Sequence, residues 1–213
     1  MPGKEGKPRT VATVADIWRG PPHPKHLHLL DNDFFGQPED QWHARLAEIR
    51  AGNFKVCFNQ GLNVRLMTPE AAREIATVDY RDDGFKVRRL YTAWDNLKDE
   101  DVFFRGVDTL EKAGIPPTHL VAYMLIRFDK KETWERLLHR FDKMVERGIR
   151  PYPMVFGDRT RTLPLGGCNA RIADRTLMEF QRWAIRKVYT FVPFEAYDAN
   201  AKGRGVRGPP IAA

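Results

Sequence analysis

Cysteine is scarce in this chain, and it contains no long apolar run. Two cysteines among 213 residues, Cys57 and Cys168, cannot form the disulfide framework that stabilises small secreted proteins. No apolar run approaches the roughly 20 residues that a membrane-spanning helix needs. The polar, basic start at 1–10 has no apolar segment behind it, so it does not have the pattern of a signal peptide. These absences predict a cytoplasmic protein with no membrane partner.

Composition and charge indicate an ordinary globular domain with a basic tail. The hydrophobic share is 42%, which is usual for a protein with a packed core. We predict one domain over 1–197 and a glycine-rich, basic, disordered tail over 198–213. The net charge is +7, with much of the excess at the chain ends. Such a charge permits a nucleic-acid or phosphorylated ligand without requiring one.

Strand-like and helix-like segments alternate along the chain. The strand-like segments cover 26–30, 55–58, 87–91, 119–126 and 150–156. Their starts are roughly thirty residues apart, the length of one βα unit. Helical patterns lie between them and at the end, at about 40–50, from 68, and over 99–113, 132–147 and 174–189. This alternation predicts an α/β fold with parallel strands and outer helices, namely a partial (βα)5-6 barrel of the TIM-barrel-like kind.

Several residues mark the expected ends of helices. Thr68 and Pro69 suit an N-cap and a first helical position. Gly52, Gly114 and Gly148 follow the last apolar position of a helical pattern, where a helix commonly stops. The apolar segment 191–197 is predicted to be either a last strand or a strap across the core.

Polar residues follow three of the predicted strands. They are Asp31-Asn32-Asp33, Asn59 to Arg65, and Trp94-Asp95-Asn96. In parallel α/β folds the ligand lies outside the carboxyl ends of the strands. The sequence therefore predicts a binding site formed by these loops.

Three blocks resemble radical S-adenosylmethionine (radical SAM) proteins. They are Leu-Leu-Asp-Asn-Asp-Phe-Phe at 29–35, Phe-Asn-Gln-Gly-Leu-Asn-Val-Arg at 58–65, and Ala-Gly-Ile at 113–115. Their order and spacing are most similar to the branch that often carries an N-terminal cobalamin-binding domain. The resemblance implies S-adenosylmethionine (SAM) and a [4Fe–4S] cluster as cofactors, and it admits cobalamin in an upstream domain. The substrate and the reaction are not implied, because one fold hosts many chemistries.

The cluster-binding CxxxCxxC loop of that family is absent from the sequence. Residues 1–9 resemble the stretch that directly follows this loop. Cys57 lies inside a predicted strand and Cys168 lies far along the chain, so neither rebuilds a motif in which several thiolates converge. We interpret the chain as a truncated radical SAM domain, whose first strand would precede Met1, and expect no radical activity from the chain alone.

The resemblance assigns roles to two strand exits. It places Asp31, Asn32 and Asp33 at the SAM amino group, which needs oxygen acceptors. It places Gln60, Asn63 and Arg65 at the SAM carboxylate or the substrate, with Arg65 in a bidentate pair. The family's usual Gly-Gly-Glu form is absent here. A turn or helix cap, or a weaker Mg²⁺ site, is the alternative for the first group, and a solvated loop is the alternative for the second.

Three further segments complete the predicted cofactor wall. Asp95 or Asn96 would hold ribose hydroxyls, and Trp94 would stack on a base or line the substrate pocket. Met124 and Ile126 would flank the adenine, and Met154 is a similar case. The alternative is that these apolar side chains are core and that Asp95 caps a helix.

Two other functions remain open. One is a basic α/β module that binds nucleic acid without catalysis, with weak contact through the tail and the 159–161 loop. The other is a cluster-free enzyme that uses Asp31, Asp33 or Asp95 as acid–base groups. His26 and His28 share a strand face with metal-ligand spacing, but no acidic or cysteine partner is evident, so no metal is predicted.

Overall fold

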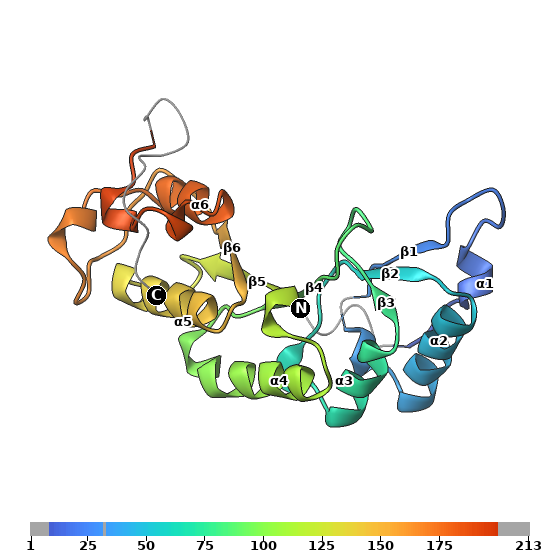
Figure 1. Ribbon diagram of the computed structural model, residues 1–213. Helices are drawn as coiled ribbons and strands as arrows, with labels where there is room; N and C mark the ends of the chain where they lie inside the picture. The colour runs from blue at the N-terminus through green and yellow to red at the C-terminus, as the bar shows by residue number, and fades with distance from the viewer. Residues whose placement is uncertain (1–8, 32, 200–213) are drawn as a thin grey trace. The chain divides into compact units, whose positions relative to one another are not determined.

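The computed structural model describes residues 9–31 and 33–199 and shows an α/β protein (Figure 1). Its contacts divide the chain into two compact units. The first comprises 1–93 and 99–121, and the second comprises 94–98 and 122–213. The sequence predicts one domain over 1–197, and within this range the contacts define two units. Of the predicted tail 198–213, all but its first two residues lie outside the described part.

Helices and strands alternate in the first unit, as the sequence predicts, apart from the additional short strand at Asp79–Tyr80. The elements are α1 (Val14–Ile17), β1 (His26–Leu29), α2 (Glu39–Ala51), β2 (Lys55–Phe58), α3 (Pro69–Ala76), β3 (Asp79–Tyr80), β4 (Leu90–Ala93) and α4 (Glu100–Lys112). The second unit holds α5 (Trp134–Glu146), β6 (Arg150–Val155) and α6 (Leu177–Ile185), and β5 (Leu120–Ile126) leads into it. Every helix in the described ranges is too short or too polar to cross a bilayer.

The strands form two three-stranded parallel sheets, in the orders β1-β2-β3 and β4-β5-β6. In the first sheet Leu27 lies opposite Val56, and Lys55 lies opposite Asp79. Parallel pairing is thus confirmed, but the described strands do not close into a barrel. The two-residue β3 was not predicted. So short a strand carries no periodic signal in the sequence.

Threonine side chains fix the starts of several helices. The Thr68 hydroxyl accepts a hydrogen bond from the Ala71 backbone N–H, with Pro69 as the first helical residue, which confirms the predicted start of α3. Thr13, Thr133 and Thr176 act in the same way at α1, α5 and α6. Each such cap satisfies a backbone donor that has no partner within its helix.

All three predicted helix stops are confirmed, because α2, α4 and α5 end at Ala51, Lys112 and Glu146, just before Gly52, Gly114 and Gly148. Gly114 and Gly148 have φ values of 91° and 78°, the left-handed region that glycine enters at no steric cost. Gly52 is different, because it keeps a helical φ of −80° and the left-handed residue is Asn53, with a φ of 54°. Asparagine tolerates that conformation better than most residues do.

Apolar stripes of the helices pack on the sheets. Leu46, Ile49 and Val56 are buried in the first unit. In the second unit, rings from α5, α6 and the segment after α6 form an aromatic core; they are Trp134, Phe141, Phe180, Trp183 and Phe194. The segment 191–197 contains a short 3-10 turn at Phe194–Ala196, so it is a strap and not a strand.

Candidate functional site

A pocket of about 400 Å³ lies beside β1 in the first unit. It is lined by residues 10–14 and Ile17, by 28–31 of β1 and its exit, and by Phe34, Gln37, Arg45 and Ile49. Asp31 is exposed on the lining, and its Oδ1 accepts a hydrogen bond from Gln37 Nε2 at 3.4 Å. Gln37 in turn accepts a hydrogen bond from the Thr10 hydroxyl, at 2.8 Å. The first predicted strand exit therefore borders a hollow that a small ligand can enter.

Arg45, which carries no sequence motif and was not predicted, lines the same pocket. Its guanidinium donates to the Ala12 carbonyl at 3.0 Å and pairs with Glu48 at 2.5 Å. Glu48 also accepts the Val14 backbone N–H, at 2.8 Å. These bonds attach the segment before β1 to α2. The Arg45 Nε is buried with no partner in the described part of the chain, which leaves one donor unsatisfied beside the pocket.

The structure describes two members of the Asp31–Asp33 triplet, and it places them differently. Asn32 lies outside the described residues. Asp33 is half-buried at the N-terminal end of the 3-10 turn Phe34–Gly36, where its carbonyl accepts the Gly36 N–H at 3.1 Å. Its side chain caps no backbone group of that turn. Of the two described members, Asp31 is therefore the one that lines the pocket.

The exit of β2 holds two of its predicted residues together. Arg65 donates from Nε to Asn63 Oδ1 at 3.1 Å, and its other guanidinium nitrogen pairs with Asp99 at 3.1 Å. Gln60 is exposed. Arg65 thus already has a carboxylate partner within the first unit, so a ligand carboxylate would have to share or displace Asp99.

Glycine at position 61 keeps this exit close to β4. Gly61 has a φ of 86°, and a β carbon there would lie 3.1 Å from the Tyr91 carbonyl. The next residue, Leu62, donates its N–H to that carbonyl at 2.7 Å. The close approach therefore orients the loop that carries Asn63 and Arg65.

The predicted residues of the second unit are mostly core. Met124 and Ile126 are completely buried, and Trp94 is 1% exposed with its indole N–H donated to the Asn96 carbonyl at 2.8 Å. Asp95 Oδ1 accepts the Leu125 backbone N–H at 2.7 Å, so it fixes the loop to β5. Met154 differs, because it is 46% exposed. Among the predicted apolar residues, only Met154 therefore has a side chain that a ligand can contact.

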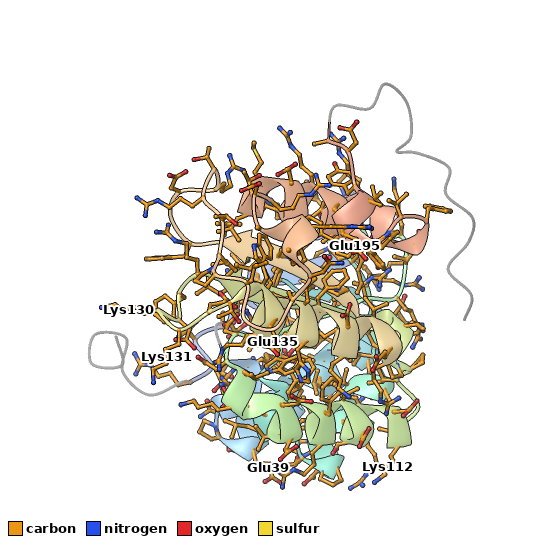
Figure 2. All side chains as sticks on the ribbon, turned by 90° about the vertical axis from the view of Figure 1, so that its left-hand side faces the viewer. Glu39, Lys112, Lys130, Lys131, Glu135 and Glu195 are labelled. Atoms are coloured by element: carbon orange, nitrogen blue, oxygen red, sulfur yellow. The ribbon has the colours of Figure 1, made fainter. Side chains whose placement is uncertain are left out.

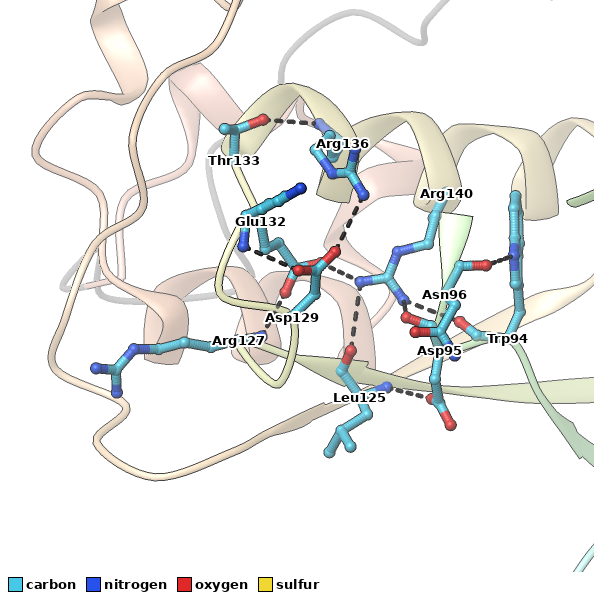
Figure 3. A network of polar contacts seen from close by, with 11 residues as sticks. Trp94, Asp95, Asn96, Leu125, Arg127, Asp129, Glu132, Thr133, Arg136 and Arg140 are labelled. Atoms are coloured by element: carbon cyan, nitrogen blue, oxygen red, sulfur yellow. Dashed lines mark hydrogen bonds and ion pairs between the residues drawn. The ribbon is translucent and has the colours of Figure 1, made fainter. Parts of the chain in front are cut away.

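A buried ion pair organises this part of the second unit (Figure 3). Arg140 on α5 and Glu132 are 2% and 6% exposed and bind each other directly. Arg140 also donates to the carbonyls of Trp94 at 2.9 Å, Asp95 at 3.0 Å and Leu125 at 3.3 Å. One sequence signal could have identified it, because Arg140 lies within the apolar stripe of its helix. Its contacts are all structural, so it positions the exit loops of β4 and β5.

The described residues contain one group with metal-ligand geometry. Donor atoms of Glu39, His43 and Glu70 lie within 4.8 Å of one another. His43 Nε2 is 2.9 Å from Glu70 Oε1, the distance of an ordinary hydrogen bond. The two histidines of β1 are placed otherwise. His26 stacks on Phe85 with ring centroids 4.2 Å apart, and His28 bonds Asn59 at 2.7 Å.

Neither cysteine is placed to hold an iron–sulfur cluster. Cys57 is completely buried in β2, and burial together with the nearby Asp82 and Asp83 carboxylates raises the pKa of its thiol to about 11. Cys168 is half-buried in the other unit, and burial also raises the pKa of its thiol. The cluster needs deprotonated thiolates that converge. The residues present do not fit that group.

Thiol labelling should separate the two cysteines. We expect a disulfide reagent at pH 8 to modify about one thiol per native chain, because only Cys168 is accessible and a thiol with a pKa near 11 is almost wholly protonated. Cys168→Ser should abolish the native reaction, and both thiols should react after unfolding in urea. Equal rates for the two cysteines in the native protein would contradict the burial of Cys57.

No protein-family model, curated protein or solved structure matches this chain.

Proposed function

We propose that this chain is the SAM-binding part of a radical SAM enzyme, with a partial (βα) barrel as its architecture. The pocket beside β1 is the observation that carries the proposal. Its volume of about 400 Å³ falls within the roughly 300–1,000 Å³ usual for small-ligand sites. It lies where the resemblance assigns the cofactor's amino-acid end, with Asp31 on its lining.

The chemistry of the lining suits the amino-acid end of SAM, which carries both the amino group and the carboxylate. The Asp31 carboxylate offers acceptors to the amino group, and the Arg45 guanidinium on the same lining offers its positive charge to the carboxylate. Leu29, Phe34 and Ile49 supply apolar surface for the rest of the molecule. We assign no position to the adenine, because the residues predicted for it belong to the other unit.

Binding is the whole of the proposed activity for this chain. Reductive cleavage of SAM draws its electron from a cluster, and the two cysteines do not fit one. We therefore expect the isolated chain to bind SAM without cleaving it.

Calorimetric titration with SAM, beside S-adenosylhomocysteine, tests this proposal. We expect a micromolar dissociation constant for SAM and a loss of about tenfold or more on Asp31→Ala, because a charge-assisted hydrogen bond contributes roughly 1.5–3 kcal/mol. Asp83→Ala is the matched control, because Asp83 is also exposed in the first unit but lies outside the pocket lining.

Three outcomes would count against the proposal. The first is absence of heat from a chain whose circular dichroism shows it to be folded. The second is an equal loss for Asp31→Ala and Asp83→Ala, which would make the effect one of net charge. The third is undiminished binding by Asp31→Ala, which would remove the pocket from the site.

A further inference from the structure

Two exposed phenylalanines lie side by side at strand exits of the second unit. Phe128 follows β5 and is 61% exposed, and Phe156 follows β6 and is 56% exposed. Their rings meet edge to face, with centroids 5.5 Å apart and an interplanar angle of 89°. Met154, which lies in β6 two residues before Phe156, is 46% exposed. Large apolar side chains in one place on a surface point to a binding function.

Backbone conformation holds these side chains outward. Arg127 has a φ of 66°, which is uncommon for a residue other than glycine, and its N–H is bound by the buried Glu132. The Phe156 N–H donates to the Ile126 carbonyl at 2.9 Å, so the two exits stay paired. Gly157, with a φ of 80°, then turns the chain away. The aromatic pair is therefore built on rigid strands and on the Glu132–Arg140 network.

Arginine joins the two exits. A β carbon at Gly157 would lie 3.5 Å from an Arg127 guanidinium nitrogen, so that side chain reaches from the exit of β5 to the exit of β6. Figure 3 shows the Arg127 side chain directed away from the buried network. We call Arg127, Phe128, Met154 and Phe156 the strand-exit patch.

Cations predominate around the strand-exit patch. Lys130 and Lys131 follow Phe128 and project outward from the ribbon (Figure 2), and Arg159 follows Gly157. The two nearby carboxylates, Asp129 and Asp158, already have partners. Asp129 pairs with Arg136 at 3.1 Å. Asp158 lies 3.5 Å from Arg161 and accepts two hydrogen bonds from Thr160. Arg127, Lys130 and Lys131 form no ion pair with any residue that the structure describes.

We propose that the strand-exit patch binds single-stranded nucleic acid. Unpaired bases stack on exposed aromatic rings, and phosphates pair with neighbouring arginine and lysine. The ring pair offers an aromatic surface that bases of any sequence can use, and the cations lie within a few residues of it. Duplex bases are already stacked, so they cannot use the rings. The site is independent of the pocket beside β1.

Fluorescence anisotropy with a labelled oligothymidine of about 15 nucleotides tests the patch, since single-strand sites span roughly 4–16 nucleotides. We expect the single strand to bind at least tenfold more tightly than a duplex of equal length. Phe128→Ala combined with Phe156→Ala should lower the single-strand affinity about tenfold or more. Phe191→Ala is the matched control, because Phe191 is 62% exposed in the same unit and lies outside the patch.

Charge variants separate the patch from the basic tail. Lys130→Gln with Lys131→Gln should flatten the salt dependence by about 0.7 in the logarithmic slope for each phosphate that these lysines neutralise. Lys143→Gln, exposed on α5, should leave the slope unchanged.

Three results would overturn the proposal. Equal affinity for single strand and duplex would indicate binding by charge alone. Undiminished binding by the double phenylalanine variant, or an equal loss on Phe191→Ala, would place the contact elsewhere, for example on the tail. If the folded chain bound no oligonucleotide at low salt, the proposed nucleic-acid binding would be wrong.

Discussion

Alanine in place of Gly106 is expected to destabilise the first unit by about 3 kcal/mol or more, which is the upper range for an overpacked site. Gly106 lies on the buried face of α4. A β carbon there would be 1.9 Å from the carbonyl oxygen of Val64 and 2.7 Å from its carbonyl carbon. Both are backbone atoms, so the helix must move as a whole away from the 3-10 turn Val64–Leu66. The usual gain of about 1 kcal/mol for alanine over glycine within a helix does not offset that movement.

Urea unfolding monitored by circular dichroism would measure this effect. Gly84→Ala is the matched control, because the nearest atom to its new β carbon is Lys86 Cγ at 3.9 Å. We expect the control to change the free energy of unfolding by less than about 0.5 kcal/mol, as for most surface substitutions. Equal or greater stability for Gly106→Ala would show that α4 does not approach the turn as closely as the structure has it.

Gly106 also links the packing of the first unit to its candidate site. The turn Val64–Leu66 carries Arg65, whose guanidinium binds Asn63 and Asp99. A displaced α4 would therefore move this strand exit without changing any predicted site residue. A substitution at Gly106 that displaces α4 less, in a chain that still folds, should leave SAM binding at the pocket beside β1 unchanged if Asp31 and Arg45 are the main contacts.

Local signals along the chain predicted much of the fold. The capped start of α3 at Thr68 and the stops at Gly114 and Gly148 depend on backbone geometry within a few residues. Alternating segments likewise located the strands, although β4 starts at Leu90, three residues later than predicted. These features are local, because caps and turns are satisfied by near neighbours.

Features that depend on distant partners were not predictable. Glycine inside a helical pattern is unfavourable, and only the carbonyl of Val64, far along the chain, explains Gly106. In the sequence, Arg140 is a charged residue within an apolar stripe. Only the structure shows the three carbonyls and Glu132 that bind it. The site shows the same limit: Asp31 could be named from its strand exit, whereas Arg45 on α2 carries no motif.

Removal of the Arg140 charge should have the largest effect in the second unit. Arg140→Met keeps much of the side-chain volume but leaves the Glu132 carboxylate buried without its partner, and breaking a buried pair in this way costs roughly 3–5 kcal/mol. The carbonyls of Trp94, Asp95 and Leu125 would be deprived of their donor as well. We expect the midpoint of urea unfolding to fall sharply.

A double variant separates the stability that the Arg140–Glu132 pair contributes from the cost of leaving the Glu132 carboxylate buried without its partner. Arg140→Met combined with Glu132→Leu removes both charges, so it should recover a large part of the stability that Arg140→Met alone loses. Recovery will be incomplete, because Glu132 also accepts the backbone N–H of Arg127.

The same helix provides the control. Arg136 on α5 pairs with Asp129, but its side chain is 36% exposed, so Arg136→Met should cost less than about 1 kcal/mol. If Arg140→Met and Arg136→Met proved equally mild, the Arg140–Glu132 pair would be open to water in solution. The strand-exit patch would then lose its rigid support, because Arg127 owes its bound, left-handed backbone to Glu132. Oligonucleotide binding by Arg140→Met, measured where the variant is still folded, therefore tests whether the buried pair orders the surface above it.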